Sequence, residues 1–533
     1  MKFDTEYFLQ NFRAHPELLA FLNAGIDATS DYQTTTPAPW AGEMYKAAEI
    51  ALGEAQISIN SEPLATLIKA GSTKTRSIEL ERSMFNIMGI DADYPFIQNT
   101  PVAFGNPLTP EQFQTISDLK KKYFPDEKIL LLVTKEILSD LGKIRYFKEC
   151  LSEKYSIAEQ DPDQFMQKLL MLPENELDGI LPSFAQLSSS EKAELQKMNR
   201  VGFHYGWYAH AESTEKELRE LQEIINEVGI EYLYCNFIAQ LFDVFAASAH
   251  DKGKILLNEA VASVYLEDIL PSLLSLTNTA PDKVYELYLE KRLKKCQLLP
   301  PDASPLTLQP KERLLARFLL MFRIYDASKA TDLQKALDYL LTTEIFTQYV
   351  AVFNAYQANP HHPVPTYMPA LLNALIAHPR IMELAHEQET NAQVVAFRVG
   401  LQLIAHALQS HQRLVAQKKI TPVNSVSFNF LTTEIKNNFD LIEIIFRKNA
   451  FAFGKDGKAC PVACLRNFSA VEQKGFVTDF MPSSAAQEPP SHHSATKRKL
   501  LFQYPMHEQK PYGLYVIEEN GRALRRSHRL TAK

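Results

Sequence analysis

Apolar residues recur every three or four positions through most of the chain, which is the spacing of one face of an α-helix. Between Glu217 and Gly229, leucine, isoleucine and valine return at this interval, and the glycine can end the helix. The same spacing predicts helices over segments 281–296, 310–325, 342–357, 368–388 and 391–416. No regular alternation of strands and helices accompanies it, so we predict a mostly α-helical fold.

Capping signals mark where several of these helices begin. Thr109 and Gln112 have the spacing of a capping box, a proline stands between them, and the segment closes near Phe124. The same box spacing recurs at Thr214–Glu217 and at Thr331–Gln334. We therefore expect amphipathic helices that begin at these positions and pack their apolar faces on a core.

Two regions break the helical pattern. Residues 420–430 alternate in polarity and are rich in β-branched and aromatic side chains, which predicts a short strand. Residues 481–496 are rich in proline, serine and alanine, which is typical of a flexible linker. Beyond them, residues 512–517, a turn at Asn520-Gly521 and residues 522–526 predict a β-hairpin.

The length of 533 residues exceeds the size at which a single hydrophobic core usually stops growing. We expect an N-terminal helical region over 1–200 and a main helical region over 201–480. The linker at 481–496 then leads to a basic hairpin tail over 497–533. The predicted fold is a large multi-helix body with a small β-containing appendage at its C-terminus.

Charge is distributed unevenly along the chain. The net charge is −7, from 56 basic and 63 acidic residues, but Lys497–Lys533 holds nine basic and three acidic residues. The body is therefore acidic and the tail basic. We expect that such a tail, if it binds anything, contacts an acidic partner.

The five cysteines are few, odd in number and mostly isolated, so they do not indicate a disulfide framework. The N-terminal residues lack the apolar run of a signal peptide, and we find no stretch of about 18 uncharged apolar residues. We expect a soluble, cytoplasmic protein, with secretion by a route that needs no signal peptide left open.

The sharpest local signal surrounds Cys460, which lies on a glycine-containing loop and precedes Pro461 and an apolar run. This order is typical of a helix N-terminus with proline in its first turn, a position that favours the thiolate form of cysteine. A thiolate held in this way can ligate heme iron.

At this loop the sequence resembles the heme-binding segment of the cytochrome P-four-fifty monooxygenases, a weak and partial resemblance over residues 370–465. Phe453, Lys458 and Cys460 match the family's aromatic, basic and iron-ligand positions. The resemblance implies a heme-thiolate oxidase of small organic substrates, with Cys460 on the iron, Phe453 beside the heme and Lys458 near a propionate. The family's Glu-x-x-Arg pair is missing from its expected place between His378 and Cys460, and the oxygen-activating Ala-Gly-x-x-Thr motif is missing as well.

A simpler interpretation makes Cys460 and Cys464 buried small residues near a turn, because unliganded cysteines usually serve as apolar filler. Two cysteines alone are also too few for a zinc site.

A second candidate site is His250-Asp251, which closes an apolar run. The pair resembles the metal-binding core of the HD phosphohydrolases, in which imidazoles and carboxylates hold a divalent metal that activates water. His204 or His210 would be the upstream ligand and Asp268 the downstream one. The alternative is an ordinary helix end at which a histidine complements the helix dipole.

A search for other catalytic motifs supports neither the heme site nor the metal site. The sequence contains no His-Glu-x-x-His, no phosphate-binding loop and no dinucleotide fingerprint. An α-rich chain without a complete motif most often serves as an interaction protein, and a secreted effector is one such type. The sequence therefore leaves three hypotheses: a heme-thiolate oxidase, a non-enzymatic partner-binding protein, and a metal-dependent phosphohydrolase.

Overall fold

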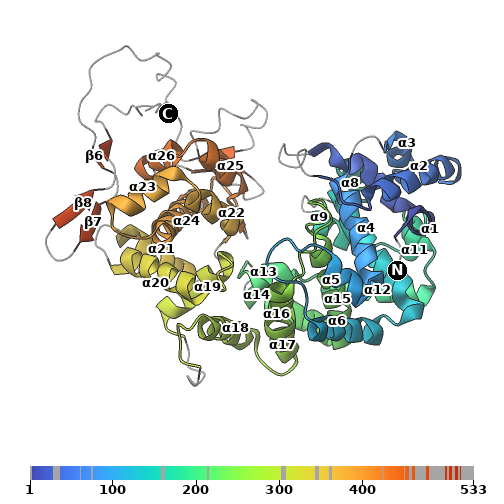
Figure 1. The fold of residues 1–533 in the computed structure, drawn as a ribbon, viewed down its shortest axis with the longest axis horizontal. Helices are drawn as coiled ribbons and strands as arrows, with labels where there is room; N and C mark the ends of the chain where they lie inside the picture. The colour runs from blue at the N-terminus through green and yellow to red at the C-terminus, as the bar shows by residue number, and fades with distance from the viewer. Residues whose placement is uncertain are drawn as a thin grey trace, which may run out of the picture. The chain divides into compact units, whose positions relative to one another are not determined.

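The fold is taken from a computed structural model of the chain. It describes residues 3–27, 36–59, 62–73, 76–157, 162–212, 215–301, 308–342, 347–358, 363–423, 425–448, 451–454, 459–461, 476–478, 499–500, 503–506, 510–513 and 516–517. Helices make up most of these residues, which confirms the predicted mostly α-helical body with a small β-containing C-terminal part (Figure 1).

The chain divides into two compact units, which we call the first and the second unit. The first unit comprises Met1–Ala209 and Glu217–Val284, and the second comprises His210–Lys216 and Tyr285–Lys533. The domain boundaries expected from the sequence stay a prediction.

The elements of the first unit are mostly short helices. In chain order they are α1 (Thr5–Ala14), η1 (Pro16–Asp27), α2 (Ala41–Ser58), α3 (Leu64–Ala70), α4 (Ile78–Asp91), α5 (Tyr94–Asn99), α6 (Pro110–Tyr123), η3 (Asp126–Lys128), α7 (Ile129–Asp140), η4 (Leu141–Lys143), α8 (Arg145–Tyr155), α9 (Pro162–Leu169), α10 (Glu174–Asp178), α11 (Pro182–Ala185), α12 (Ser189–Val201), α13 (Tyr205–Ala209), α14 (Glu215–Val228), α15 (Ile230–Ala246), α16 (Glu259–Ser263), η5 (Val264–Ile269), α17 (Leu270–Leu274) and η6 (Ser275–Thr277).

The second unit continues from α18 (Pro281–Lys295), whose first turn still belongs to the first unit. Its other helices are α19 (Pro310–Met321), α20 (Ala327–Thr342), α21 (Thr347–Ala358), α22 (Met368–Ile376), α23 (Pro379–Glu387), α24 (Ala392–Ala416), α25 (Asn429–Asn437) and α26 (Asp440–Lys448). Its strands are β1 (Val364–Thr366), β2 (Ser425–Ser427), β3 (Phe451–Gly454), β4 (Ala459–Pro461), β5 (Phe476–Thr478), β6 (Lys499–Leu500), β7 (Gln503–Met506), β8 (Lys510–Gly513) and β9 (Val516–Ile517).

One of the predicted capping boxes is confirmed, and a second is not. Thr109 and Gln112 make the expected reciprocal capping box at the start of α6. The box predicted at Thr331 is wrong, because α20 begins four residues earlier and Thr331 lies inside it. Asp326 supplies the cap there, accepting a hydrogen bond of 2.9 Å from the Lys329 amide. Thr214 lies outside the described residues.

A proline explains why one segment predicted as a single helix is two helices in the structure. The predicted segment 368–388 is two helices, α22 and α23, because Pro379 disfavours a helical conformation at His378. His378 caps α23 instead, accepting from the Arg380 amide at 3.1 Å. The segment 391–416 is one helix, α24, with Asn391 as its cap.

Two glycines allow close contacts between helices of the first unit, because they have no side chain at the contact. A Cβ on Gly89 of α4 would lie 2.6 Å from the ring of Phe245, so the glycine lets α4 and α15 approach each other. A Cβ on Gly142 of η4 would collide with the Pro162 carbonyl oxygen and lie 2.9 Å from Met166 Cγ. This glycine therefore fixes the start of α9 against the end of α7.

The core of the second unit forms around α24. Figure 1 shows this helix in the middle of the unit, and α20, α21, α22, α23 and α26 contact it. Most of its side chains between Val394 and Leu408 are buried, as expected for a helix enclosed by others.

The strands form small sheets rather than a continuous one. The strand predicted over 420–430 is confirmed only at β2, which pairs in parallel with β1. β3 pairs with both β4 and β5 in an antiparallel three-stranded sheet.

The C-terminal strands pair differently from the predicted hairpin. Tyr512 of β8 pairs with Tyr504 of β7, and β9 pairs with β6. The predicted turn at Asn520-Gly521 and the returning strand at 522–526 lie outside the described residues, as does the predicted linker at 481–496. A β-containing tail is confirmed, but β8 and β9 pair with strands that precede them in the sequence, β7 and β6.

Within the described residues, one helical stretch is long and apolar enough to be considered as a membrane span. This is Glu259–Thr277, and 44% of its most apolar window is already buried in the protein. Length and composition alone are weak evidence, because buried core helices pass the same test.

We predict that Gly142→Ala destabilises the first unit by about 1–3 kcal/mol, because the added methyl group overpacks the contact between η4 and α9. Gly53→Ala is the matched control, since a Cβ on Gly53 in α2 would meet nothing within 4 Å. Urea unfolding of both variants measures the difference. Equal stability of the two variants would contradict the close approach at Gly142.

Candidate functional site

A polar stripe runs along α4, although most of this helix is buried. Glu79, Arg82, Ser83 and Asn86 occupy positions i, i+3, i+4 and i+7, so they share one face. The helices α7 and α15 both pack against α4. Polar side chains in the interior need partners, and the neighbouring helices supply most of them.

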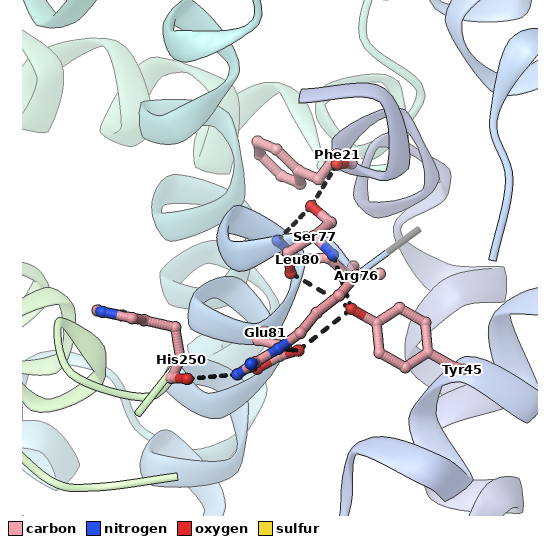
Figure 2. A network of polar contacts seen from close by, with 7 residues as sticks. All are labelled: Phe21, Tyr45, Arg76, Ser77, Leu80, Glu81 and His250. Carbon is pink, nitrogen blue, oxygen red and sulfur yellow. Dashed lines mark hydrogen bonds and ion pairs between the residues drawn. The ribbon is translucent and has the colours of Figure 1, made fainter. Parts of the chain in front are cut away.

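The first turn of α4 is tied down by a paired charge. Arg76 contacts Glu81 through two nitrogen atoms, with its Nε 2.6 Å from Oε1 and its Nη2 2.9 Å from Oε2. Glu81 is fully buried and also accepts a hydrogen bond of 3.2 Å from the Tyr45 hydroxyl. Arg76 donates to the His250 carbonyl oxygen as well, while the imidazole of His250 points away (Figure 2).

Ser77 completes this network as the N-cap of α4. Its hydroxyl accepts from the Leu80 amide at 3.3 Å and donates to the Phe21 carbonyl oxygen at 2.5 Å (Figure 2). The network joins η1, α2, α4 and the loop after α15. Every group in it faces another protein group, so we assign it a structural role.

The second turn of the stripe meets a buried carboxyl group on α7. Glu136 is only 8% exposed and accepts a hydrogen bond of 2.6 Å from Asn86 Nδ2. Burial raises the pKa of Glu136 well above its ordinary value, although nearby Lys135 opposes the shift. In the part of the chain that the structure describes, the Asn86 Oδ1 atom and the Ser83 hydroxyl have no hydrogen-bond partner.

Three aspartates extend this region to the surface, and we call Asp140, Asp163 and Asp243 the acidic face. Lys143 Nζ lies 2.5 Å from Asp140 Oδ1 and 3.5 Å from Glu79 Oε2. The side chains of Asp163 and Asp243 are both exposed. One lysine thus stands among several carboxylates.

Asp243 has an unusual position, because it is open to water and yet has protein close on several sides. The resulting loss of hydration raises the pKa of Asp243, and the charges of Asp140 and Asp163 raise it further, whereas Lys143 lowers it. Gln240 donates a hydrogen bond of 2.7 Å to its Oδ2 atom. The three carboxylates of the acidic face therefore lie close enough to influence one another through their charge, with Lys143 opposing the repulsion.

The placement of Asp163 follows from contacts of α9. Gly142 allows the start of α9 to lie against η4, and Asn199 Nδ2 donates to the Gln167 carbonyl oxygen at 2.8 Å. These contacts hold both ends of the short helix. Asp163 stands in its first turn, where a carboxylate also complements the helix dipole.

His204 and Trp207 adjoin the acidic face. The two rings stack with centroids 4.1 Å apart and planes inclined by 21°. His204 Nδ1 lies 3.9 Å from Asp163 Oδ2. The aromatic run 203–208 thus contributes buried residues, Tyr205 and Tyr208, and an exposed one, Trp207.

The predicted metal ligands His250 and Asp251 lie next to basic side chains. Burial and the charges of Arg82 and Arg76 lower the pKa of His250 to about 4, so its imidazole is neutral. Asp251 pairs with Lys254 at 2.6 Å.

Across the described residues, no three His, Cys, Asp or Glu side chains converge as a metal site would require. Of the other proposed ligands, His204 lies beside Asp163, His210 belongs to the second unit, and Asp268 is buried in η5. The metal hypothesis stays a prediction.

The expectation that Pro461 lies in the first turn of a helix is wrong. Residues 459–461 form β4, and Cys460 pairs with Ala452 of β3, because the residues of β3 are apolar and extended. Pro461 ends the strand, a position that needs no amide hydrogen.

The described neighbours of Cys460 do not fit a heme. Its side chain is fully buried against Leu441, with Phe430, Ile444 and Phe476 packed around them. A heme iron would need an open approach to this sulfur atom. Phe453 is buried in β3, where its ring meets that of His411, and Lys458 and Cys464 lie outside the described residues. The heme stays a prediction.

The sequence analysis missed the stripe on α4 and the acidic face. The stripe has a readable signal, four polar residues at helical spacing within an apolar helix. The acidic face has none, because Asp140, Asp163 and Asp243 come from three separate helices.

We predict that Glu136→Gln makes the protein more stable at about pH 8 and that the gain disappears toward about pH 4. Since the folded-state pKa is raised, the stability that Glu136 contributes is present below the ordinary glutamate pKa and is lost as pH rises through the folded value. Chemical unfolding across this pH range measures it, with exposed Glu127→Gln as the control. A gain that is independent of pH would contradict the raised pKa.

Comparison with known proteins gives one match. A model of a family of unknown function, DUF6829, matches residues 79–438. This segment begins at the first residue of the stripe on α4, includes the whole acidic face, and ends before Cys460. No curated protein and no solved structure matches the chain. Because the model covers more than half of the chain, the protein belongs to this family of unknown function.

Proposed function

We propose that the protein is a helical partner-binding protein whose acidic face receives a positively charged segment of the partner. The observation that carries this proposal is the crowding of like charge at Asp243, an exposed carboxyl group whose pKa the nearby Asp140 and Asp163 raise. A cationic side chain brought from outside would relieve this repulsion. The proposal develops the interaction hypothesis drawn from the sequence.

Rigid placement supports recognition by this surface. Asp140 and Asp243 stand on α7 and α15, two helices that pack together, and Asp163 is held by the contacts of α9. Charges fixed in this way lose little conformational entropy when a partner binds. Complementary charge also steers a partner toward the surface and orients it.

The chemistry of the groups favours an organic cation over a metal ion. A divalent cation needs several oxygen ligands within about 2.6 Å. The carboxylates of the acidic face act on one another through their charge, but among the described residues no three His, Cys, Asp or Glu side chains converge closely enough to hold a metal ion. Ammonium and guanidinium groups on a flexible segment can each reach a separate carboxylate.

The polar stripe of α4 gives a second reason to expect a ligand near the acidic face. The Ser83 hydroxyl and the Asn86 carbonyl oxygen are more than nine-tenths buried and find no partner within the described residues. Both stand on the stripe of α4 that Glu136 faces. Such groups occur more often near functional sites than in a core built for stability alone.

We predict that the double variant Asp163→Asn, Asp243→Asn binds a basic peptide about fivefold more weakly, from roughly 0.5 kcal/mol per exposed ion pair. The probe is a fluorescein-labelled peptide in which arginine alternates with serine, and fluorescence anisotropy gives the Kd. Binding of the parent should weaken with salt and strengthen as pH rises, because ionised Asp243 binds the cation better.

The matched control is Asp118→Asn, Glu127→Gln, which removes the same charge from exposed positions elsewhere in the first unit. If the control weakens binding as much as the acidic-face variant, the peptide responds only to net charge and the proposal is wrong. Retained affinity in both double variants would contradict it equally.

A further inference from the structure

Trp207 is a large side chain left partly in water. Its exposed fraction is 42%, whereas the neighbouring Tyr205 and Tyr208 are fully buried. Tryptophan carries the largest apolar surface of any side chain, and it is enriched among the residues that contribute most to protein interfaces. The exposure of this one residue in an otherwise buried aromatic run therefore needs an explanation.

The local geometry holds the indole in place while part of it stays exposed. His204 stacks on Trp207 at 4.1 Å between ring centroids, so it supports one face of the indole. The residue keeps 42% of its surface exposed in spite of this stack. A ring fixed in this way loses little side-chain entropy when a partner contacts it.

The indole also borders on negative charge. His204 Nδ1 lies 3.9 Å from Asp163 Oδ2, and the Asp163 side chain is 49% exposed. Asp163 in turn raises the pKa of Asp243 through its charge. Through His204 the exposed aromatic ring thus lies near the exposed carboxylate of Asp163, and both kinds of group attract cations.

We infer that Trp207 is the anchor for an arginine side chain of the basic segment that the acidic face receives. This inference rests on the proposed function and adds the identity of the residue recognised. One basic residue of the partner meets Asp163 and Asp243, and an arginine lies flat against the exposed part of the Trp207 ring.

Arginine fits this position better than lysine for a physical reason. Its guanidinium group is planar, stacks on an aromatic face and is less strongly hydrated than an ammonium group. Stacking on tryptophan is also the strongest of the cation–π contacts that aromatic side chains make. The surface should therefore distinguish two peptides that have equal charge.

The experiment compares arginine–serine and lysine–serine peptides of the same length on the full chain. Trp40 and Trp207 are the two tryptophans of the sequence, so Trp40→Phe leaves Trp207 as the fluorophore. We expect the arginine peptide to quench its emission. We expect Trp207→Ala to weaken arginine-peptide binding about fivefold and to abolish the preference for arginine, with Trp207→Phe in between.

Phe104→Ala is the matched control, since Phe104 is another exposed aromatic residue of the first unit at 54%. Circular dichroism and thermal unfolding establish that each variant is folded. Unchanged emission and an unchanged preference for arginine in Trp207→Ala would overturn the inference. If the aspartate double variant still weakens binding in that case, the proposed function stands alone; if it does not, both are wrong.

Discussion

Pairing of the charges that α4 carries into the interior is the constraint on which the first unit depends. An ion held away from water without a partner destabilises a fold by several kcal/mol. Arg76 and Glu81 meet this demand at the first turn, and Glu79 is shared between Arg82 at 3.2 Å and Lys143 at 3.5 Å. These contacts bring α2, η4 and the loop after α15 to α4, because Tyr45 donates to Glu81, Lys143 lies near Glu79, and Arg76 donates to the His250 carbonyl oxygen. Glycines at the helix contacts permit the close approach that the pairs need.

The same constraint explains where recognition can occur. Charges on α4 find partners inside the unit, and toward the surface Lys143 lies among the carboxylates of Asp140, Asp163 and Asp243. Carboxylates placed close together attract positive groups. Trp207 adds an apolar contact beside it, so charge and burial can act on one partner segment.

Local signals in the sequence predicted local structure. Features that depend on contacts between residues far apart in the sequence could not be predicted in this way. Thr109 and Gln112 lie three residues apart, and their capping box formed as expected. Cys460 looked like the start of a helix, but its pairing with Ala452 of β3 made it part of a strand. The acidic face was not predictable, because its members are joined only by the packing of α7, α9 and α15. Neither the heme nor the metal hypothesis gains a complete set of described ligands.

The most direct test of the central claim is the pKa of Asp243 itself, followed by carboxyl-carbon NMR in the free protein and with the arginine peptide bound. The account predicts that the pKa is raised in the free protein and falls toward the ordinary aspartate range when the peptide supplies positive charge. An ordinary pKa in the free protein, or a raised pKa that the bound peptide leaves unchanged, would contradict it.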